Sequence, residues 1–152
     1  MPEAVIVAAG RSAIGRAHKG HLVGVCPDDL AAEVTRKVLA AVPQVSNVPI
    51  DDVICGCARP VGEQGFTLGR VISILARLEA PGCTVSRVCA LSLQSIRMAA
   101  HAIQAGEGHV YVSVGIECCR AIRPIAGAAT RGIVGWSPAT VSTTPTSTSR
   151  WA

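Results

Sequence analysis

The alternation of short apolar runs with helical segments is the feature that most limits how this chain can fold. Four runs rich in β-branched side chains predict buried strands, and three segments with helical spacing lie between them. The predicted strands are 3–10, 52–58, 84–88 and 109–117, and the predicted helices are 28–42, 67–78 and 89–105. Because strands that alternate with helices favour a parallel sheet with right-handed crossovers, we predict an α/β fold.

Composition agrees with such a sheet over the first part of the chain. Hydrophobic residues make up 49% of the sequence and aromatic residues only 3%, so the core must rest on aliphatic side chains. No acidic residue follows Glu117, and nine of the thirteen residues from 137 to 149 are Ser or Thr. We therefore expect residues 1–119 to form the α/β part, and residues 120–152 to form an irregular or disordered tail.

Charge and apolar patterning argue against several classes of protein. The net charge is +4, but the basic residues are scattered and no basic run is interleaved with aromatics, which argues against nucleic-acid binding. No apolar stretch approaches the ~20 residues of a membrane span. The first residues carry no basic region typical of a signal peptide, and the seven cysteines are an odd number. We expect reduced thiols and a cytoplasmic protein.

The predicted helix 89–105 is apolar over most of its circumference. Its polar side is narrow, and the apolar or small arc spans roughly 240°, whereas packing on one sheet needs little more than about 100°. The polar side consists of Gln94, Arg97, His101 and Gln104, and the larger apolar residues are Leu91, Leu93, Ile96, Met98 and Ile103. We expect this helix to need cover on two sides.

Cys89 stands at the start of this helix, directly after a predicted strand. The free N–H groups and the positive dipole end of a helix stabilise a thiolate over a thiol, and a thiolate there is a usual form of nucleophile. The alternative is a small apolar core residue, which is what most free cysteines are.

The segment around Cys89, "VSRVCALSLQSIRMAAHAIQAGEG", resembles the nucleophile segment of the thiolases, the acetyl-CoA acetyltransferases and 3-ketoacyl-CoA thiolases. The start "AVIVAAGRSAIGRAHKGHL", the stretch "DDVICGCARPVGEQGFTLGR" and the strand "VGIE" resemble the same family in the same order. The resemblance extends from residue 3 to about 119. It identifies residues 1–119 as an incomplete thiolase N-terminal domain.

The resemblance implies a mechanism. Cys89 would be acylated by an acyl-CoA or 3-ketoacyl-CoA, a histidine would deprotonate it, and a second cysteine would move the α-proton of acetyl-CoA. Two oxyanion holes would stabilise the developing charges. The coenzyme A thioester is the substrate, so no further cofactor is expected. The family fold has two similar α/β halves with the nucleophile helix between their sheets, and its members associate as dimers or dimers of dimers.

This sequence departs from the family pattern. It contains neither the Gly-His-Pro motif of the family's base nor the Cys-x-Gly-Gly-Gly motif of its second cysteine. The loop domain that binds most of the CoA would begin near residue 119. Within the matched part, four positions carry unusual residues, which are Ala13, Thr67, Ser86 and Leu91.

Other chemically capable residues are weaker candidates. His101 lies roughly 18 Å along the helix from Cys89, at about 1.5 Å per residue, and cannot reach it. His109 is expected at a strand edge, and His18 and His21 on a loop. Cys55 and Cys57 share a strand face, but neither they nor the pair at 118–119 has Cys-x-x-Cys spacing, so we predict no metal site. The loop "GEQGFTLG" lacks a phosphate-binding lysine.

Two classes of function follow. The first is a thiolase-type acyltransferase, represented by an N-terminal part that we expect to be inactive alone. The alternative is a non-catalytic, decayed fragment that associates with an intact thiolase or with a second copy. The ketoacyl synthases, which share the fold and a nucleophilic cysteine, fit the start motif and the "GEQGF" loop less well.

Overall fold

The computed structural model describes residues 2–16, 18–45 and 47–118 of the chain. Three parallel strands form its sheet in the order β2-β1-β3. The strands are β1 (Asp52–Gly56), β2 (Gly82–Val85) and β3 (Tyr111–Gly115), and the α-helices are α1 (Pro27–Ala40), α2 (Leu68–Leu75) and α3 (Leu91–Ala105). Short 3-10 helices lie at His21–Gly24, Pro43–Val45 and Gly62–Gln64. The predicted parallel α/β fold is confirmed.

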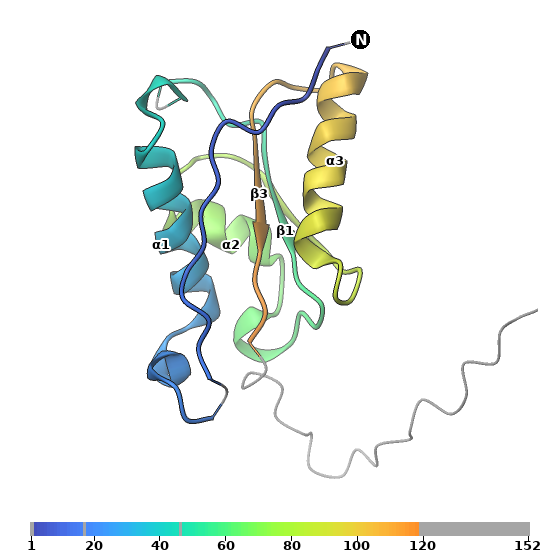
Figure 1. Ribbon diagram of the computed structural model, residues 1–152. Coiled ribbons are helices and arrows are strands. Elements are labelled where there is room, and N and C mark those ends of the chain that lie inside the picture. Colours follow the sequence, from blue (N-terminus) through green and yellow to red (C-terminus); the bar gives the residue numbers. More distant parts are fainter. Residues whose placement is uncertain (1, 17, 46, 119–152) are drawn as a thin grey trace, which may run out of the picture.

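The sheet is the middle of three layers. Figure 1 shows α1 and α2 on one side of the strands and α3 on the other. In the register of the sheet, Val53 of β1 lies opposite Gly82 of β2 and Val112 of β3. Because all three strands run in the same direction, their carboxyl ends meet at one edge of the sheet, where the chain passes from β2 into α3.

The main core lies between the sheet and the α1–α2 layer. Its fully buried members include Val53 and Cys55 of β1 and Cys57 directly after it, and Leu68 and Ile72 of α2 pack against them. Small residues of α1, Ala31 and Ala32, complete this side. The core is therefore aliphatic, as the composition indicates.

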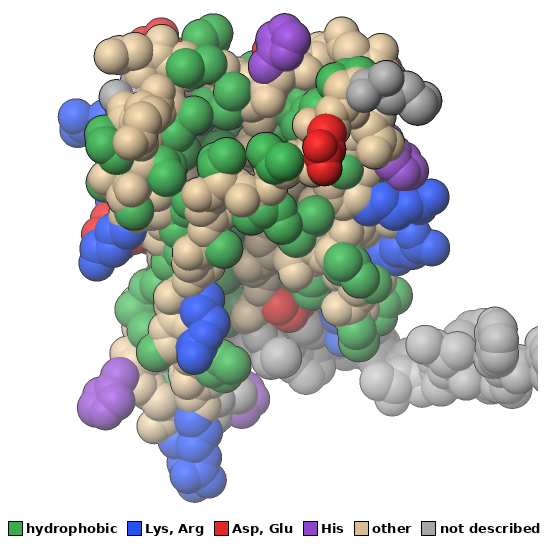
Figure 2. All heavy atoms as spheres, turned by 45° about the horizontal axis from the view of Figure 1, so that its top comes forward, with side chains coloured by type: hydrophobic (Ala, Val, Ile, Leu, Met, Phe, Trp, Pro, Cys, Tyr) green, Lys and Arg blue, Asp and Glu red, His purple; other side chains and the backbone are tan. Residues whose placement is uncertain are grey.

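The α3 side of the sheet is covered less completely. Only Ser95 and Ala99 of α3 are buried, while the Leu93 side chain is 69% exposed and Ile96 is 40% exposed. Figure 2, turned so that the top of Figure 1 comes forward, shows hydrophobic side chains among polar ones over the face that is turned to the viewer. Within the described residues, α3 therefore has one covered and one open side, as its wide apolar arc predicts.

The predicted first strand at 3–10 is wrong. This segment is extended but makes no backbone ladder with the described sheet, and Val5, Ile6 and Val7 are 68%, 73% and 67% exposed. Gly10 packs instead against α1, where an added Cβ would lie 2.6 Å from Val38 Cγ2. β propensity reports an extended conformation, but a strand also needs a partner edge, which a hydrophobic run does not specify.

Several predicted boundaries also shift. The third predicted strand begins earlier and is shorter, at Gly82–Val85, and the fourth is reduced to Tyr111–Gly115. The second predicted helix ends at Leu75, and the third begins at Leu91 instead of Cys89. The predicted tail at 120–152 lies outside the described residues, as does Cys119. In the part of the chain that the structure describes, no helix is both long and apolar enough to cross a bilayer.

Candidate active site around Cys89

Cys89 lies in the short connection between β2 and α3, at the carboxyl edge of the sheet. The strand ends at Val85, the helix begins at Leu91, and the Cys89 side chain is exposed. Ligand sites of open parallel sheets gather outside the carboxyl ends of the strands. The connection therefore places the cysteine where this class of fold carries its chemistry.

The turn that carries Cys89 has a strained backbone. Val88, directly before the cysteine, has φ of 46°. A β-branched side chain crowds the backbone in this left-handed region, so such a residue is a true outlier. Within this turn the Ala90 N–H donates a hydrogen bond to the Arg87 carbonyl at 3.1 Å. Strain that the surrounding structure maintains is typical of functional turns.

Two glycines allow the first turn of α3 to lie directly on the strand ends. A Cβ on Gly56, the last residue of β1, would lie 2.1 Å from the Leu91 carbonyl oxygen. A Cβ on Gly115, the last residue of β3, would lie 2.4 Å from Ser92 Cβ. Neither contact is possible for a larger residue without movement of the helix. These glycines therefore fix the height of the Cys89 turn above the sheet.

Four of the other described cysteines have thiols whose pKa is raised. The first turn of α3 has N–H groups without intrahelical partners, and they favour an anion near the helix start. Burial raises the pKa of the Cys55 thiol to about 12 and that of Cys57 to about 11. A hydrogen bond with Asp28 is the main cause that raises the pKa of Cys26 to about 11, and burial also raises the pKa of Cys83. These four thiols are held protonated at neutral pH.

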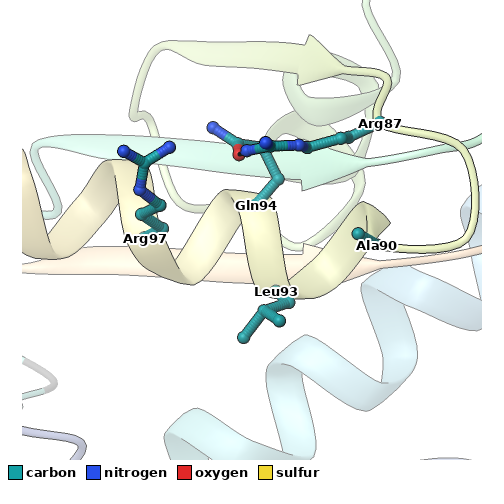
Figure 3. Close-up of a pocket in the computed structure, with 5 residues that line it drawn as sticks. All are labelled: Arg87, Ala90, Leu93, Gln94 and Arg97. Atoms are coloured by element: carbon teal, nitrogen blue, oxygen red, sulfur yellow. Dashed lines mark hydrogen bonds between the residues drawn. The ribbon is translucent and has the colours of Figure 1, made fainter. Parts of the chain in front are cut away.

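A shallow hollow of about 480 Å³ lies beside the Cys89 turn. Its lining residues are Arg87, Ala90, Leu93, Gln94 and Arg97. Figure 3 shows Arg87 and Gln94 lying together, with Arg97 on the same side of α3 and Leu93 pointing away from them. The Arg87 guanidinium donates a hydrogen bond to the Gln94 side-chain oxygen. The hollow thus has two positive side chains along its lining, which begins at the turn that contains Cys89.

The histidines do not join Cys89 in the described structure. His101 lies on α3 and lines a second hollow of about 510 Å³ together with Asp51, Asp52 and Tyr111, at the other end of β1. His109 is exposed just before β3, His21 lies in the first 3-10 helix, and His18 has φ of 63° in a turn. No hydrogen bond connects a histidine side chain to Cys89 among the described residues. Among the residues that the structure describes, no histidine is therefore paired with the Cys89 thiol.

Cys55, Cys57 and Cys118 belong to no group of three possible metal ligands in the described part of the chain, and Cys119 lies outside it. Cys55 and Cys57 are buried in the core, and Cys118 follows β3, where its backbone N–H donates to Gln64 Oε1 at 2.8 Å. Among the described residues, the side chains of Cys26, Asp28 and Asp29 form a cluster within 4.8 Å that sequence spacing did not reveal. It lies at the start of α1, far along the chain from Cys89, and exposed acidic groups commonly cluster without an ion.

Sequence reasoning missed the polar contacts that support the Cys89 turn. The Ser86 hydroxyl, at one of the unusual positions, donates to the Ala58 carbonyl at 2.9 Å. The loop that contains Ala58 is held in turn by Glu117 and Gln64. Two signals in the sequence could have indicated this network. Gln64 lies in a Gly-rich stretch, and the acidic Glu117 ends a predicted strand.

Comparison with known proteins places these features in a family. The family model "Thiolase, N-terminal domain" matches residues 4–127. A β-ketoadipyl-CoA thiolase of Acinetobacter baylyi is 43% identical over 119 residues, which cover 77% of this chain and 29% of the relative. A 3-ketoacyl-CoA thiolase of Bacillus subtilis is 41% identical over 133 residues, or 86% of this chain and 34% of the relative. The chain spans about a third of these relatives' length.

Proposed function

Because the chain belongs to the thiolase family, we propose that it carries the acyl-accepting part of an acyl-CoA acyltransferase, with Cys89 as the residue that is acylated. The names of the relatives, β-ketoadipyl-CoA and 3-ketoacyl-CoA thiolase, support a 3-ketoacyl-CoA or acyl-CoA as the substrate class. On the same basis we propose a role in fatty acid metabolism in the cytoplasm. Since the chain spans less than two thirds of these relatives, the activity of the whole enzyme is part of the proposal.

The proposed chemistry has two half-reactions. In the first, the Cys89 sulfur attacks the thioester carbonyl carbon, a bond forms between sulfur and the acyl group, and the bond to the CoA sulfur breaks. The CoA leaves as a thiol, with the proton that Cys89 lost. In the second, acetyl-CoA loses an α-proton, its α-carbon attacks the acyl group, and Cys89 leaves and recovers a proton. The product is a 3-ketoacyl-CoA, and thiolysis is the reverse sequence.

The observation that carries the proposal is the placement of Cys89 at a strained turn between β2 and α3. The turn presents an exposed thiol at the start of a 15-residue helix, whose first N–H groups favour negative charge. The other described cysteines are partly or fully buried. Among the described cysteines, Cys89 is therefore the one best placed to attack a thioester that approaches from solvent.

The hollow beside the turn suits an anionic substrate. Arg87 and Arg97 line it, and coenzyme A carries phosphate groups that guanidinium groups bind well. We propose that these two side chains attract the thioester toward Cys89.

Turnover needs groups that do not contact Cys89 in the described structure. A base must take its proton, and a second residue must handle the α-proton of acetyl-CoA. Loss of members of a catalytic unit typically costs several orders of magnitude in rate. We therefore propose that the chain alone is acylated without continuous turnover.

Release of CoA thiol from acetyl-CoA tests this function. The 152-residue chain should release CoA slowly, up to about one equivalent per chain, and then stop. The Cys89→Ser variant should abolish this release, whereas Cys83→Ser should not, because Cys83 is only partly exposed in β2. Release that survives Cys89→Ser would refute the proposal.

A second candidate function, association with an intact thiolase or another copy of this chain, is favoured by the open side of α3. Leu93 and Ile96 leave an apolar strip uncovered, and exposed strips of this kind favour association. Co-elution of the chain with an intact thiolase, lost on Leu93→Lys, would support this role. Separate elution of the two proteins would count against it.

A further inference from the structure

The Glu117 carboxylate holds the loop that follows β1. Its Oε2 accepts hydrogen bonds from the Ala58 N–H at 2.8 Å and from the Arg59 N–H at 3.4 Å, while Oε1 accepts from Gln64 Nε2 at 2.8 Å. The Cys57 thiol also approaches Oε2, at 3.7 Å. Glu117 follows β3, so these bonds connect the ends of two neighbouring strands.

Gln64 completes the connection from inside the protein. Its side chain is fully buried, and its Nε2 donates to the Arg59 carbonyl at 2.8 Å in addition to Glu117. Its Oε1 accepts the Cys118 N–H at 2.8 Å. Within the described residues, the ion pairs found both involve Glu33, so neutral N–H groups stabilise the Glu117 charge instead of a Lys or Arg. A half-buried carboxylate with this many neutral donors requires a well-defined loop conformation.

The same loop contacts the turn that carries Cys89. The Ala58 carbonyl accepts the Ser86 hydroxyl at 2.9 Å, and the Cys57 N–H donates to the Val85 carbonyl at 3.0 Å. Ser86 lies three residues before Cys89, in the strained segment that contains Val88. Glu117 and the Cys89 turn are thus joined through one residue, Ala58, whose N–H donates to Glu117 and whose carbonyl accepts from Ser86.

We propose that Glu117 is a positioning residue for Cys89, acting through Ala58 and Ser86 to hold the thiol at the start of α3. This role rests on the proposed function of Cys89 as the acyl acceptor. Glu117 itself takes no part in the covalent steps. Its removal should let the turn relax away from the helix start, where the N–H groups favour a thiolate.

A double-mutant cycle in the full 152-residue chain tests the proposal. Glu117→Gln keeps the size of the side chain but turns an amide N–H₂ toward the Gln64 amide, so that two donors face each other. Ser86→Ala removes the hydroxyl that reaches Ala58. The measured quantity is the rate of Cys89 alkylation by iodoacetamide, as a function of pH, with peptide mapping. Glu107→Gln, which removes a carboxylate beyond the far end of α3, is the matched control.

Each single variant should be alkylated roughly threefold to tenfold more slowly at neutral pH, and the double variant no more slowly than the slower single. The pH profile should move to higher pH in Glu117→Gln. Simple loss of a nearby negative charge would move it to lower pH, so the direction separates positioning from a charge effect. Glu107→Gln should behave as the parent chain.

Multiplicative effects in the double variant, or a shift of the profile to lower pH, would overturn the proposal. Labelling of the buried Cys55 and Cys57 reports any loss of the fold. If the Glu117→Gln variant does not fold, the Ser86→Ala variant decides by itself, because Ser86 is exposed. An unchanged pH profile of Cys89 alkylation in Ser86→Ala would then overturn the proposal. Failure of the chain to take an acetyl group from acetyl-CoA, with the alkylation pattern intact, would remove the proposed function and leave the positioning role standing.

Discussion

At the scale of single residues, the geometry of the site depends on two glycines as much as on Cys89. Gly56 and Gly115 let the backbone of α3 contact the strand ends, and Val88 has a left-handed conformation next to Cys89. The likeness to thiolases indicated which cysteine to consider, but these close approaches follow from the tertiary packing of α3 on β1 and β3. No local pattern around Gly56 specifies that a helix will lie on it.

Gly56→Ala should destabilise the fold and displace the Cys89 turn. Its Cβ would overlap the Leu91 carbonyl, which is backbone and cannot rotate away, so we expect a loss of about 1–3 kcal/mol in the free energy of unfolding. Cys89 alkylation in the folded fraction should also change. Urea unfolding followed by circular dichroism measures the first effect, and peptide mapping the second.

Gly24→Ala is the matched control, because an added Cβ there has nothing within 4 Å. It should alter the urea midpoint little. Equal destabilisation by the two variants would show that general glycine effects, and not the contact with α3, are responsible.

At the scale of secondary-structure elements, the sequence predicted three of the four strands and all three helices approximately. The exception is the segment 3–10, which is apolar as expected but does not pair with the described sheet. A hydrophobic run does not specify whether a neighbouring strand will be available for pairing. The start of α3 was placed at Cys89 because the apolar periodicity begins near there, whereas the positive φ of Val88 delays the helix to Leu91. The hydrogen bonds from the loop after β1 to Glu117 could not be predicted without knowing that β1 and β3 are neighbours.

The pairing of β1 with β3 depends on a carboxylate at its beginning. Asp51 Oδ2 accepts the backbone N–H groups of His109 at 2.6 Å and Val110 at 2.8 Å, and the bond to Val110 is the main cause that lowers the Asp51 pKa from 3.8. A lowered folded-state pKa stabilises the fold above the ordinary pKa, and this contribution is lost as the pH falls through the folded value.

Asp51→Asn should therefore reduce stability at neutral pH but not in strong acid. The urea midpoints of the parent chain and the variant should differ near pH 7 and converge below the ordinary Asp51 pKa of 3.8, over a range in which both remain folded. A difference that stays constant across this range would show that the carboxylate charge does not contribute through these hydrogen bonds.

At the scale of the whole molecule, the described part has one well-packed core and one open side. The α1–α2 layer buries aliphatic side chains fully, while α3 leaves Leu93 and Ile96 in contact with solvent. Net stability of a domain is only about 5–15 kcal/mol, and each large apolar side chain left exposed forgoes roughly 1.5–3 kcal/mol. The wide apolar arc of residues 89–105 predicted this imbalance, although it could not show which side of the helix the sheet would cover.

The open side of α3 should make the isolated chain self-associate. Leu93→Lys should lower the average mass measured by light scattering at micromolar concentration, with the urea midpoint nearly unchanged, because the Leu93 side chain is 69% exposed. Ile14→Lys is the control, since Ile14 is 92% exposed outside α3. An equal fall in mass for both variants would assign association to general apolar exposure.

The central claim is that Cys89 accepts an acyl group from a CoA thioester, and locating that group tests it most directly. The chain is incubated with acetyl-CoA, digested at low pH to preserve the thioester, and mapped by tandem mass spectrometry. We predict one acetyl group per chain on Cys89, and none on Cys55 or Cys57, whose pKa values burial raises to about 12 and about 11. Acetylation of another cysteine in the folded chain, or acetylation that persists in Cys89→Ala, would contradict the account.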